Sequence, residues 1–193
     1  MEKKRQIQLT EGPILKSLIG LALPIMASSF LGTLYNITDM AWIGILGSKA
    51  VAAVGVGGMY IWLSQGLSTL ARMGGQVYVA QCFGQGKREE AAKYARAALQ
   101  LTVLFAILFS LICVLFAEPL VAFFNLGDEE TIRNAVSYLR IACGLIIFPY
   151  LNVVLTGLYT AQGNSRTPFL ANFSGLFVNM IMDPVLILGV GFF

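Results

Sequence analysis

The chain has 193 residues, of which 57% are hydrophobic and 12% are charged, and it contains no histidine. An average soluble domain carries about 25% charged residues, so the composition predicts a membrane protein. The lack of histidine excludes Ser-His-Asp and Cys-His nucleophilic centres and zinc sites built on imidazole. The net charge of +3 is small and the basic residues lie beside apolar runs, so nucleic acid is not expected as a partner. The three cysteines have no short repeated spacing, which indicates neither a disulfide framework nor a metal cluster.

Five apolar stretches are long enough to cross a bilayer, which takes about 20 residues of helix. They cover residues 17–46, 51–83, 95–116, 132–161 and 168–193. The first two exceed the minimum, so we expect them to tilt or to extend beyond the lipid. The predicted fold class is therefore an all-α membrane protein, a polytopic bundle of transmembrane helices. A polar start and a long first apolar run do not fit a cleavable signal peptide.

The basic residues gather on one side of these five spans. Nine of the 13 lie before the first span, between the second and third, or between the fourth and fifth: Lys3, Lys4, Arg5, Lys16, Lys87, Arg88, Lys93, Arg96 and Arg166. The loop after the third span carries acidic residues instead: Glu118, Asp128, Glu129 and Glu130. By the positive-inside rule, we expect the N-terminus in the cytoplasm and the protein in the plasma (inner) membrane. Five crossings place the C-terminus outside, and the apolar ending suggests a bundle that has been cut short.

Asp39 and Asp183 are the only acidic residues well inside an expected span, where a carboxylate is costly unless it is protonated, paired or hydrated. Tyr35 and Asn36 precede Asp39 by four and three residues, so the three share one helical face. Asn179 precedes Asp183 by four residues in the same way. Two polar stripes that end in Asp, both in the outer half of the membrane, favour an ion site between two helices. Hydrogen bonding that merely holds the helices together is the structural alternative. Arg72 also lies inside a span, and its role is left open.

Several short motifs follow one another along the chain. They are EGPI at 11–14, LALPI at 21–25, YNITD at 35–39, WIG at 42–44, GQGK at 84–87, EEA at 89–91, QGNSRTP at 162–168 and NMIMDP at 179–184. Over nearly the whole chain, they resemble the N-terminal lobe of multidrug and toxic compound extrusion (MATE) transporters. The resemblance implies a transporter of twelve helices in two six-helix lobes. Residues 1–193 would supply about five of the six helices of the first lobe, without the sixth helix and the second lobe.

The resemblance also implies a function, that of a secondary active antiporter. Such a protein exports organic cations, drugs and other xenobiotics in exchange for protons or Na⁺. It is not an enzyme, and it needs no cofactor beyond the coupling ion. Its expected partners are the lipid bilayer, small amphipathic or cationic substrates, and the missing C-terminal lobe.

The predicted cation site combines the helical-face pattern with the resemblance. By resemblance, Asp39, Asn179 and Asp183 occupy the cation-site positions of the family, and they are the possible Na⁺ ligands. A Tyr and an Asn of the family's fourth-span polar network are matched by Tyr138 and Asn152. The full predicted set is Asn36, Asp39, Tyr138, Asn152, Asn179 and Asp183. Carboxylate and amide oxygens suit a proton and Na⁺ alike, so the coupling ion is left open.

Two other functions fit some of the same features. A flippase for a lipid-linked substrate belongs to the same superfamily, but flippases commonly line the cavity with several basic residues, and only Arg72 is clearly intramembrane here. An intramembrane aspartyl protease would use Asp39 and Asp183 as a catalytic pair. Its Gly-x-Gly-Asp signature is absent around both residues. Independent transport by one incomplete lobe is not expected, because alternating access needs a second bundle to move against.

Overall fold

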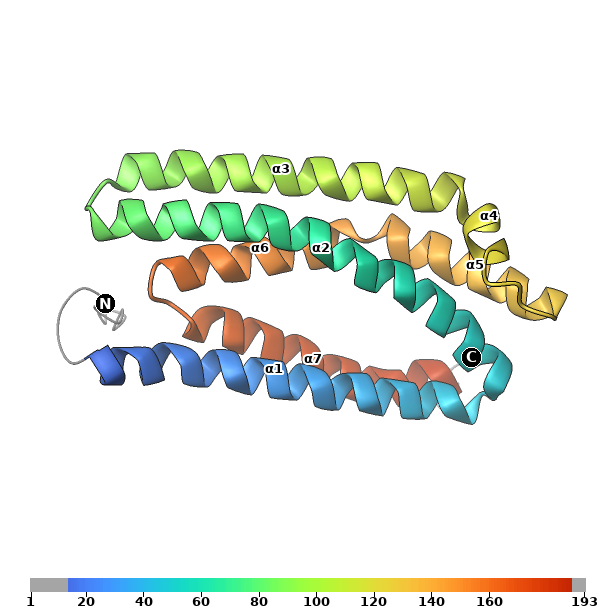
Figure 1. The fold of residues 1–193 in the computed structure, drawn as a ribbon. Coiled ribbons are helices and arrows are strands. Elements are labelled where there is room, and N and C mark those ends of the chain that lie inside the picture. Colours follow the sequence, from blue (N-terminus) through green and yellow to red (C-terminus); the bar gives the residue numbers. More distant parts are fainter. Residues whose placement is uncertain (1–13, 189–193) are drawn as a thin grey trace.

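In the computed structural model, which describes residues 14–188, the chain is a bundle of long helices and short connections (Figure 1). No strand occurs in that range, which confirms the all-α prediction. The seven helices are α1 (Ile14–Ile45), α2 (Ser48–Gly84), α3 (Arg88–Leu115), α4 (Ala117–Ala122), α5 (Glu129–Gly144), α6 (Ile147–Ala161) and α7 (Arg166–Leu188). The predicted stretch 189–193 lies outside the described residues.

Four of the helices are long and apolar enough to cross a membrane singly. They are α1, α2, α3 and α7, and their bounds follow the first, second, third and fifth predicted spans. The pair α5 and α6 passes the same test only when the two helices are taken together, which makes five candidate spans in all. The composition therefore predicted the number of candidate crossings within residues 14–188.

The fourth predicted span, residues 132–161, is not one continuous helix. It is broken between Gly144 and Ile147, where α5 and α6 meet at 43°. The physical cause is Pro149, which has no N–H to donate to the Leu145 carbonyl and whose ring clashes with that carbonyl in a regular helix. The break redirects α6, so the residues after it lie on a different axis from Tyr138.

The connections sort into two ends of the bundle (Figure 1). The start of α1, the α2–α3 turn and the α6–α7 turn lie at one end, which carries the basic residues Lys87, Arg88 and Arg166. The α1–α2 turn, α4 and the start of α5 lie at the other end, with the acidic residues of the 117–130 segment. Both turns of the basic end contain a glycine at φ 75°, Gly86 and Gly163, which closes the preceding helix. The basic and acidic loops of the sequence therefore lie at opposite ends of the folded bundle.

The tightly packed part of the bundle consists of α2, α3, α5 and α6. Its buried residues are mostly small, which lets helix backbones approach closely in a lipid environment: Ala53, Ala71, Ala91, Ala98, Ala106, Ala135 and Ala161. A hydrogen bond also joins two of these helices, because the buried Tyr150 hydroxyl of α6 donates to the Ser64 carbonyl of α2 at 2.8 Å. We call these four helices the packed core.

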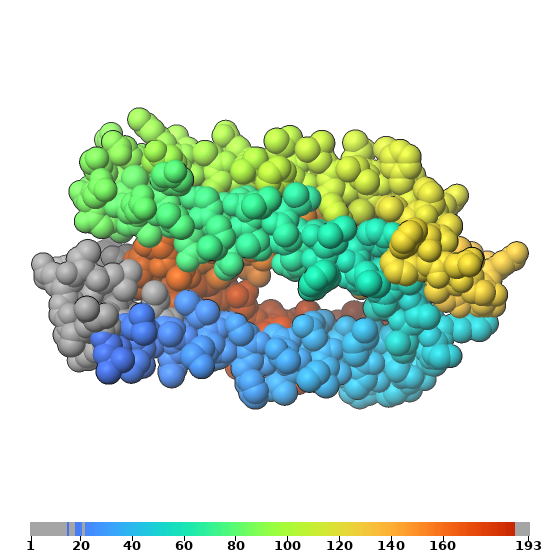
Figure 2. Space-filling view, in the orientation of Figure 1, coloured from blue at the N-terminus to red at the C-terminus, as the bar shows by residue number. Residues whose placement is uncertain are grey.

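The helices α1 and α7 form a separate pair, which we call the α1–α7 pair. The two helices run parallel, because both begin at the basic end of the bundle (Figure 1). The two helices pack chiefly on each other, and α1 touches α2 only lightly. Figure 2 shows a hollow between the α1 side and the α2 side of the molecule. The cavities described next lie between the α1–α7 pair and the packed core.

Candidate cation site

Asp39 lies in the part of α1 nearer the acidic end of the bundle, on the side that faces the packed core. Its side chain is half-buried, and with Asn36 it lines a cavity of about 490 Å³ between α1, α2 and α5. The opposite wall is made of Gly55 and Gly58 of α2 together with Tyr138 of α5. The small glycines leave the space that a carboxylate and an ion need. We call this cavity the Asp39 cavity.

Asp183 approaches the same region from α7. Its carboxylate lies close enough to Asp39 for the two charges to interact. The Asp183 Oδ2 atom is buried and has no hydrogen-bond partner among the described residues. A buried carboxylate oxygen without a donor is costly unless it is protonated or binds a cation. The pair therefore has the geometry and the unmet bonding capacity of an ion site.

Tyr35 and Asn179 lie one helical turn before Asp39 and Asp183, respectively. The Tyr35 hydroxyl is within hydrogen-bonding reach of the Asn179 amide, so the two polar stripes face each other across the α1–α7 pair. Tyr35 also lies close enough to both carboxylates to feel their charge. The sequence placed Tyr35 on the correct face, but it is not in the predicted residue set, because a tyrosine in an apolar helix rarely indicates a ligand. Its spacing of four residues from Asp39 was the available signal.

Tyr138 completes the wall of the Asp39 cavity from the packed core. Its ring is half-buried and lies directly over Gly57 of α2, where any larger residue would collide with it. The ring also lies near enough to Asp39 to interact with its charge. Five of the six predicted residues thus meet around the two carboxylates: Asn36, Asp39, Tyr138, Asn179 and Asp183.

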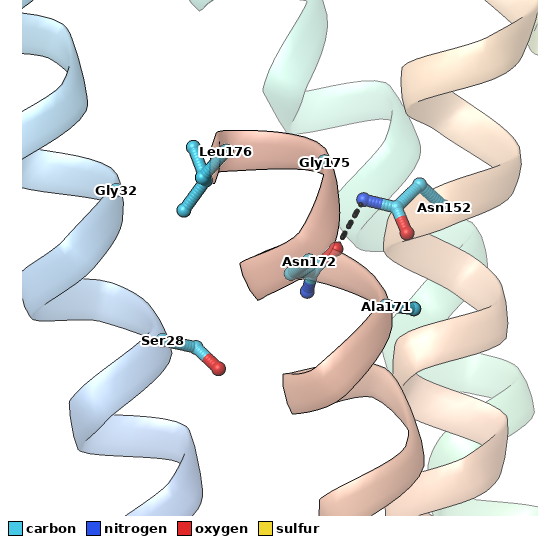
Figure 3. Close-up of a pocket in the computed structure, with 7 residues that line it drawn as sticks. All are labelled: Ser28, Gly32, Asn152, Ala171, Asn172, Gly175 and Leu176. Atoms are coloured by element: carbon cyan, nitrogen blue, oxygen red, sulfur yellow. Dashed lines mark hydrogen bonds between the residues drawn. The ribbon is translucent and has the colours of Figure 1, made fainter. Parts of the chain in front are cut away.

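Asn152 does not line the Asp39 cavity but a different one (Figure 3). Its amide nitrogen donates to the Asn172 side-chain oxygen at 3.0 Å, and this bond links α6 to α7. Both residues line a second cavity of about 470 Å³, with Ser28 of α1 facing them. Ser28 precedes Asp39 by three helical turns, or about 16 Å at 1.5 Å per residue. Asn152 also follows Tyr138 by 14 residues, or about 21 Å at 1.5 Å per residue, which is too far for the two side chains to share a cavity.

The donors around the carboxylate pair are all oxygens or amides. Among residues 14–188, no cluster of three or more acidic, His or Cys side chains is present. Two carboxylates, an amide and phenol hydroxyls are groups that hold a proton or a hard monovalent cation such as Na⁺. The arrangement can therefore bind one small cation between α1 and α7.

Comparison with known proteins identifies the family of this bundle. A model of the MatE family matches residues 24–185. The probable multidrug resistance protein NorM of Thermotoga maritima is 27% identical over 91% of this chain and 38% of its own length. The FAD transporter of Shewanella oneidensis is 26% identical over 95% of this chain and 40% of its own length. The multidrug export protein MepA of Staphylococcus haemolyticus is 22% identical over 98% of this chain and 42% of its own length.

Solved structures show the same fold. A crystal structure of MATE in complex with MaD5 superposes with a TM-score of 0.90 at 24% identity, over 99% of this chain and 43% of the other. A MOP superfamily transporter from Pyrococcus furiosus superposes with a TM-score of 0.87 at 24% identity, over 100% of this chain and 42% of the other. The chain spans about two-fifths of the length of the curated relatives it matches. It therefore belongs to the MatE family of multidrug and toxic compound extrusion transporters, a family of membrane transporters rather than enzymes.

Proposed function

We propose that residues 1–193 form most of the first lobe of a secondary active antiporter, which exports amphipathic organic cations and drugs in exchange for protons or Na⁺. The observation that carries the proposal is the carboxylate pair, Asp39 on α1 and Asp183 on α7, with a buried Asp183 oxygen that has no donor within residues 14–188. The names of the relatives, which include multidrug exporters, support the class of cargo.

The carboxylate pair couples ion binding to helix position. Two negative charges in a low-dielectric region repel each other, and each loses hydration. A bound proton or Na⁺ removes that repulsion and draws α1 and α7 together. Because the α1–α7 pair contacts the packed core lightly, its movement changes the cavities that lie between the two units. Cation binding would then favour the shape with low affinity for the exported compound, as alternating access requires.

The sidedness of the bundle sets the direction of the exchange. Positive-inside topology puts the basic end, with Lys87, Arg88 and Arg166, in the cytoplasm of a plasma-membrane protein. Asp39 then lies toward the outer end of α1, where a cation from outside reaches it first. The complete transporter requires the remaining helices, which supply the second bundle for the movement.

Drug susceptibility of a bacterium that lacks its own major exporters tests the proposal. We expect the full-length protein to raise resistance to cationic dyes and biocides, and Asp39→Asn and Asp183→Asn to return it to background at equal protein levels. The matched control is Glu89→Gln, an exposed carboxylate at the basic end of α3. Full resistance in both Asn variants would contradict the coupling role of the pair. Family membership also favours transport over the aspartyl protease alternative.

A further inference from the structure

A third cavity lies nearer the basic end of the bundle, between α1, α2, α6 and α7. Its volume is about 240 Å³, and Arg72 of α2 and Ser165 line it together with hydroxyl and amide groups of the neighbouring helices. We call it the Arg72 cavity. It shares Ser28 and Asn172 with the cavity of Figure 3, but it contains neither Asp39 nor Asp183.

Arg72 has no charge partner in the part of the chain that the structure describes. The ion pairs found between residues 14 and 188 are formed by Lys49, Lys87 and Arg140. The Nε atom of Arg72 is buried and has no hydrogen-bond partner there. No acidic side chain of the described residues lines the cavity. A guanidinium at membrane depth is costly unless it is paired or hydrated, so Arg72 requires an acceptor.

The fold makes room for Arg72 to enter the cavity. Gly157 of α6 is buried, and a Cβ atom added there would lie 2.6 Å from Cγ of Arg72 and 3.2 Å from its Cδ. The aliphatic stem of the arginine thus passes over the one backbone position of α6 that lacks a side chain. This close fit holds the stem in place, which reduces the entropy that the guanidinium loses when it binds.

Ser165 provides a second unmet group. It is 3% exposed, it directly precedes α7, and its hydroxyl has no hydrogen-bond partner among the described residues. Three other hydroxyls of the cavity, those of Ser28, Ser29 and Thr160, already donate to carbonyls of their own helices. A half-buried guanidinium whose Nε atom is buried, together with the buried Ser165 hydroxyl, matches an anionic oxygen group.

We propose that the Arg72 cavity binds the carboxylate or phosphate group of an amphipathic molecule. The guanidinium of Arg72 holds two oxygens of the group, and the Ser165 hydroxyl donates to one of them. The source is either a soluble amphipathic compound or the headgroup of an anionic lipid, which share this chemistry. The site is separate from the carboxylate pair, so the two ends of the hollow differ in the sign of the charge that they accept.

Equilibrium binding of two matched dyes tests the proposal in the full-length protein in nanodiscs. One dye is a rhodamine with a free carboxylate, and the other is its methyl ester, which lacks that negative charge. We expect Arg72→Gln to weaken binding of the acid about tenfold or more and to change binding of the ester less than about twofold. Arg72→Lys keeps the charge but loses the planar guanidinium. Its affinity for the acid should therefore lie between the affinities of wild type and Arg72→Gln.

Two further variants keep the test decisive if Arg72→Gln fails to fold. Ser165→Ala should weaken binding of the acid by about threefold and spare the ester. Arg96→Gln removes an exposed arginine of α3 and should leave both dyes unaffected. Equal affinity of wild type and folded variants for the acid, or an equal loss for both dyes, would overturn the proposal. No ion gradient is applied, so the outcome does not depend on the proposed antiport.

The lipid composition of the nanodiscs distinguishes the two sources. If phosphatidylglycerol, added to phosphatidylcholine, weakens binding of the acid to wild type but not to Ser165→Ala and Arg72→Gln, a lipid headgroup occupies the cavity. If the affinity of wild type is the same in both membranes, the cavity is assigned to soluble amphipathic anions.

Discussion

At the scale of single residues, Gly57 sets the position of the Tyr138 ring in the Asp39 cavity. A Cβ atom at residue 57 would lie 2.7 Å from the Tyr138 Cε1 atom, so the ring would have to move. We expect Gly57→Ala to lower the free energy of unfolding by about 1–3 kcal/mol and to slow ion-coupled efflux, because Tyr138 leaves the cavity wall. Thermal unfolding in detergent and efflux from vesicles measure the two effects.

Gly58 is the matched control for this substitution. No atom lies within 4 Å of a Cβ added there, although Gly58 also lines the Asp39 cavity. Alanine is a better helix former than glycine by about 0.5–1 kcal/mol, so Gly58→Ala should be neutral or stabilising. Equal stability of the two variants would show that Tyr138 does not rest on Gly57.

The carboxylate pair was predictable from the sequence, and the rest of the site only in part. Asp39 and Asp183 stand out because acidic residues are rare inside apolar spans. Their polar stripes follow from helical spacing, which brought in Asn36 and Asn179. Asn152 was predicted for the same site from motif position alone. It follows Tyr138 by 14 residues, or about 21 Å of helix, so the spacing alone places the two residues at different depths of the bundle.

At the scale of secondary-structure elements, the contact between α2 and α3 depends on Gly75. A Cβ atom there would lie 2.5 Å from the Ala98 Cβ atom, so the two helices would have to separate. We expect Gly75→Ala to lower the free energy of unfolding by about 1–3 kcal/mol. The adjacent Gly74 has open space, and Gly74→Ala should not destabilise the protein. Thermal unfolding of the two variants tests this, and a stable Gly75→Ala protein would contradict the close approach.

The N-terminal end of α5 is held by Asp128, which caps the helix. The carboxylate accepts hydrogen bonds from the Thr131 hydroxyl at 2.9 Å and the Thr131 N–H at 3.1 Å, and it pairs with Lys49 at 3.1 Å. The Thr131 hydroxyl, followed by Lys49, holds the pKa of Asp128 below its usual range. Because the pKa is lower in the folded state, the stabilisation is complete above the unfolded value of about 3.9 and is lost as the pH falls through the folded value.

This linkage predicts how acid affects the cap. The Tm of the wild type should fall as the pH drops below about 4, and Asp128→Asn should have a lower Tm at neutral pH and lose this part of the pH dependence. Glu129→Gln changes an exposed neighbour that makes no ion pair among the described residues, so it should keep the wild-type profile. Parallel pH profiles for wild type and Asp128→Asn would argue against the cap.

The helices themselves were largely predictable, but the bend between α5 and α6 was not. Apolar length indicates that residues 132–161 cross the membrane, and the pair does so when taken as one span. Length does not reveal that Pro149, in the first turn of α6, interrupts the helical hydrogen bonds at Leu145. The proline was visible in the sequence, yet other prolines are accommodated inside intact helices, as Pro24 and Pro184 are.

At the scale of the whole molecule, the described lobe consists of the packed core and the α1–α7 pair. Small buried residues join the helices of the packed core, whereas polar cavities separate it from the pair. Hydropathy indicates which residues face an apolar environment, but it does not distinguish lipid from a neighbouring helix. The division into two units could therefore not be predicted from the sequence. The placement of the basic and acidic loops at opposite ends could be predicted from it.

The central claim is that a cation bound between Asp39 and Asp183 drives export. The most direct test is efflux of a fluorescent organic cation from proteoliposomes that contain the full-length protein, with proton and Na⁺ gradients imposed separately. We expect one gradient to drive efflux in wild type and in the exposed control Glu129→Gln, and neither gradient to drive it in Asp39→Asn. Gradient-driven efflux at the wild-type rate in Asp39→Asn would contradict the account.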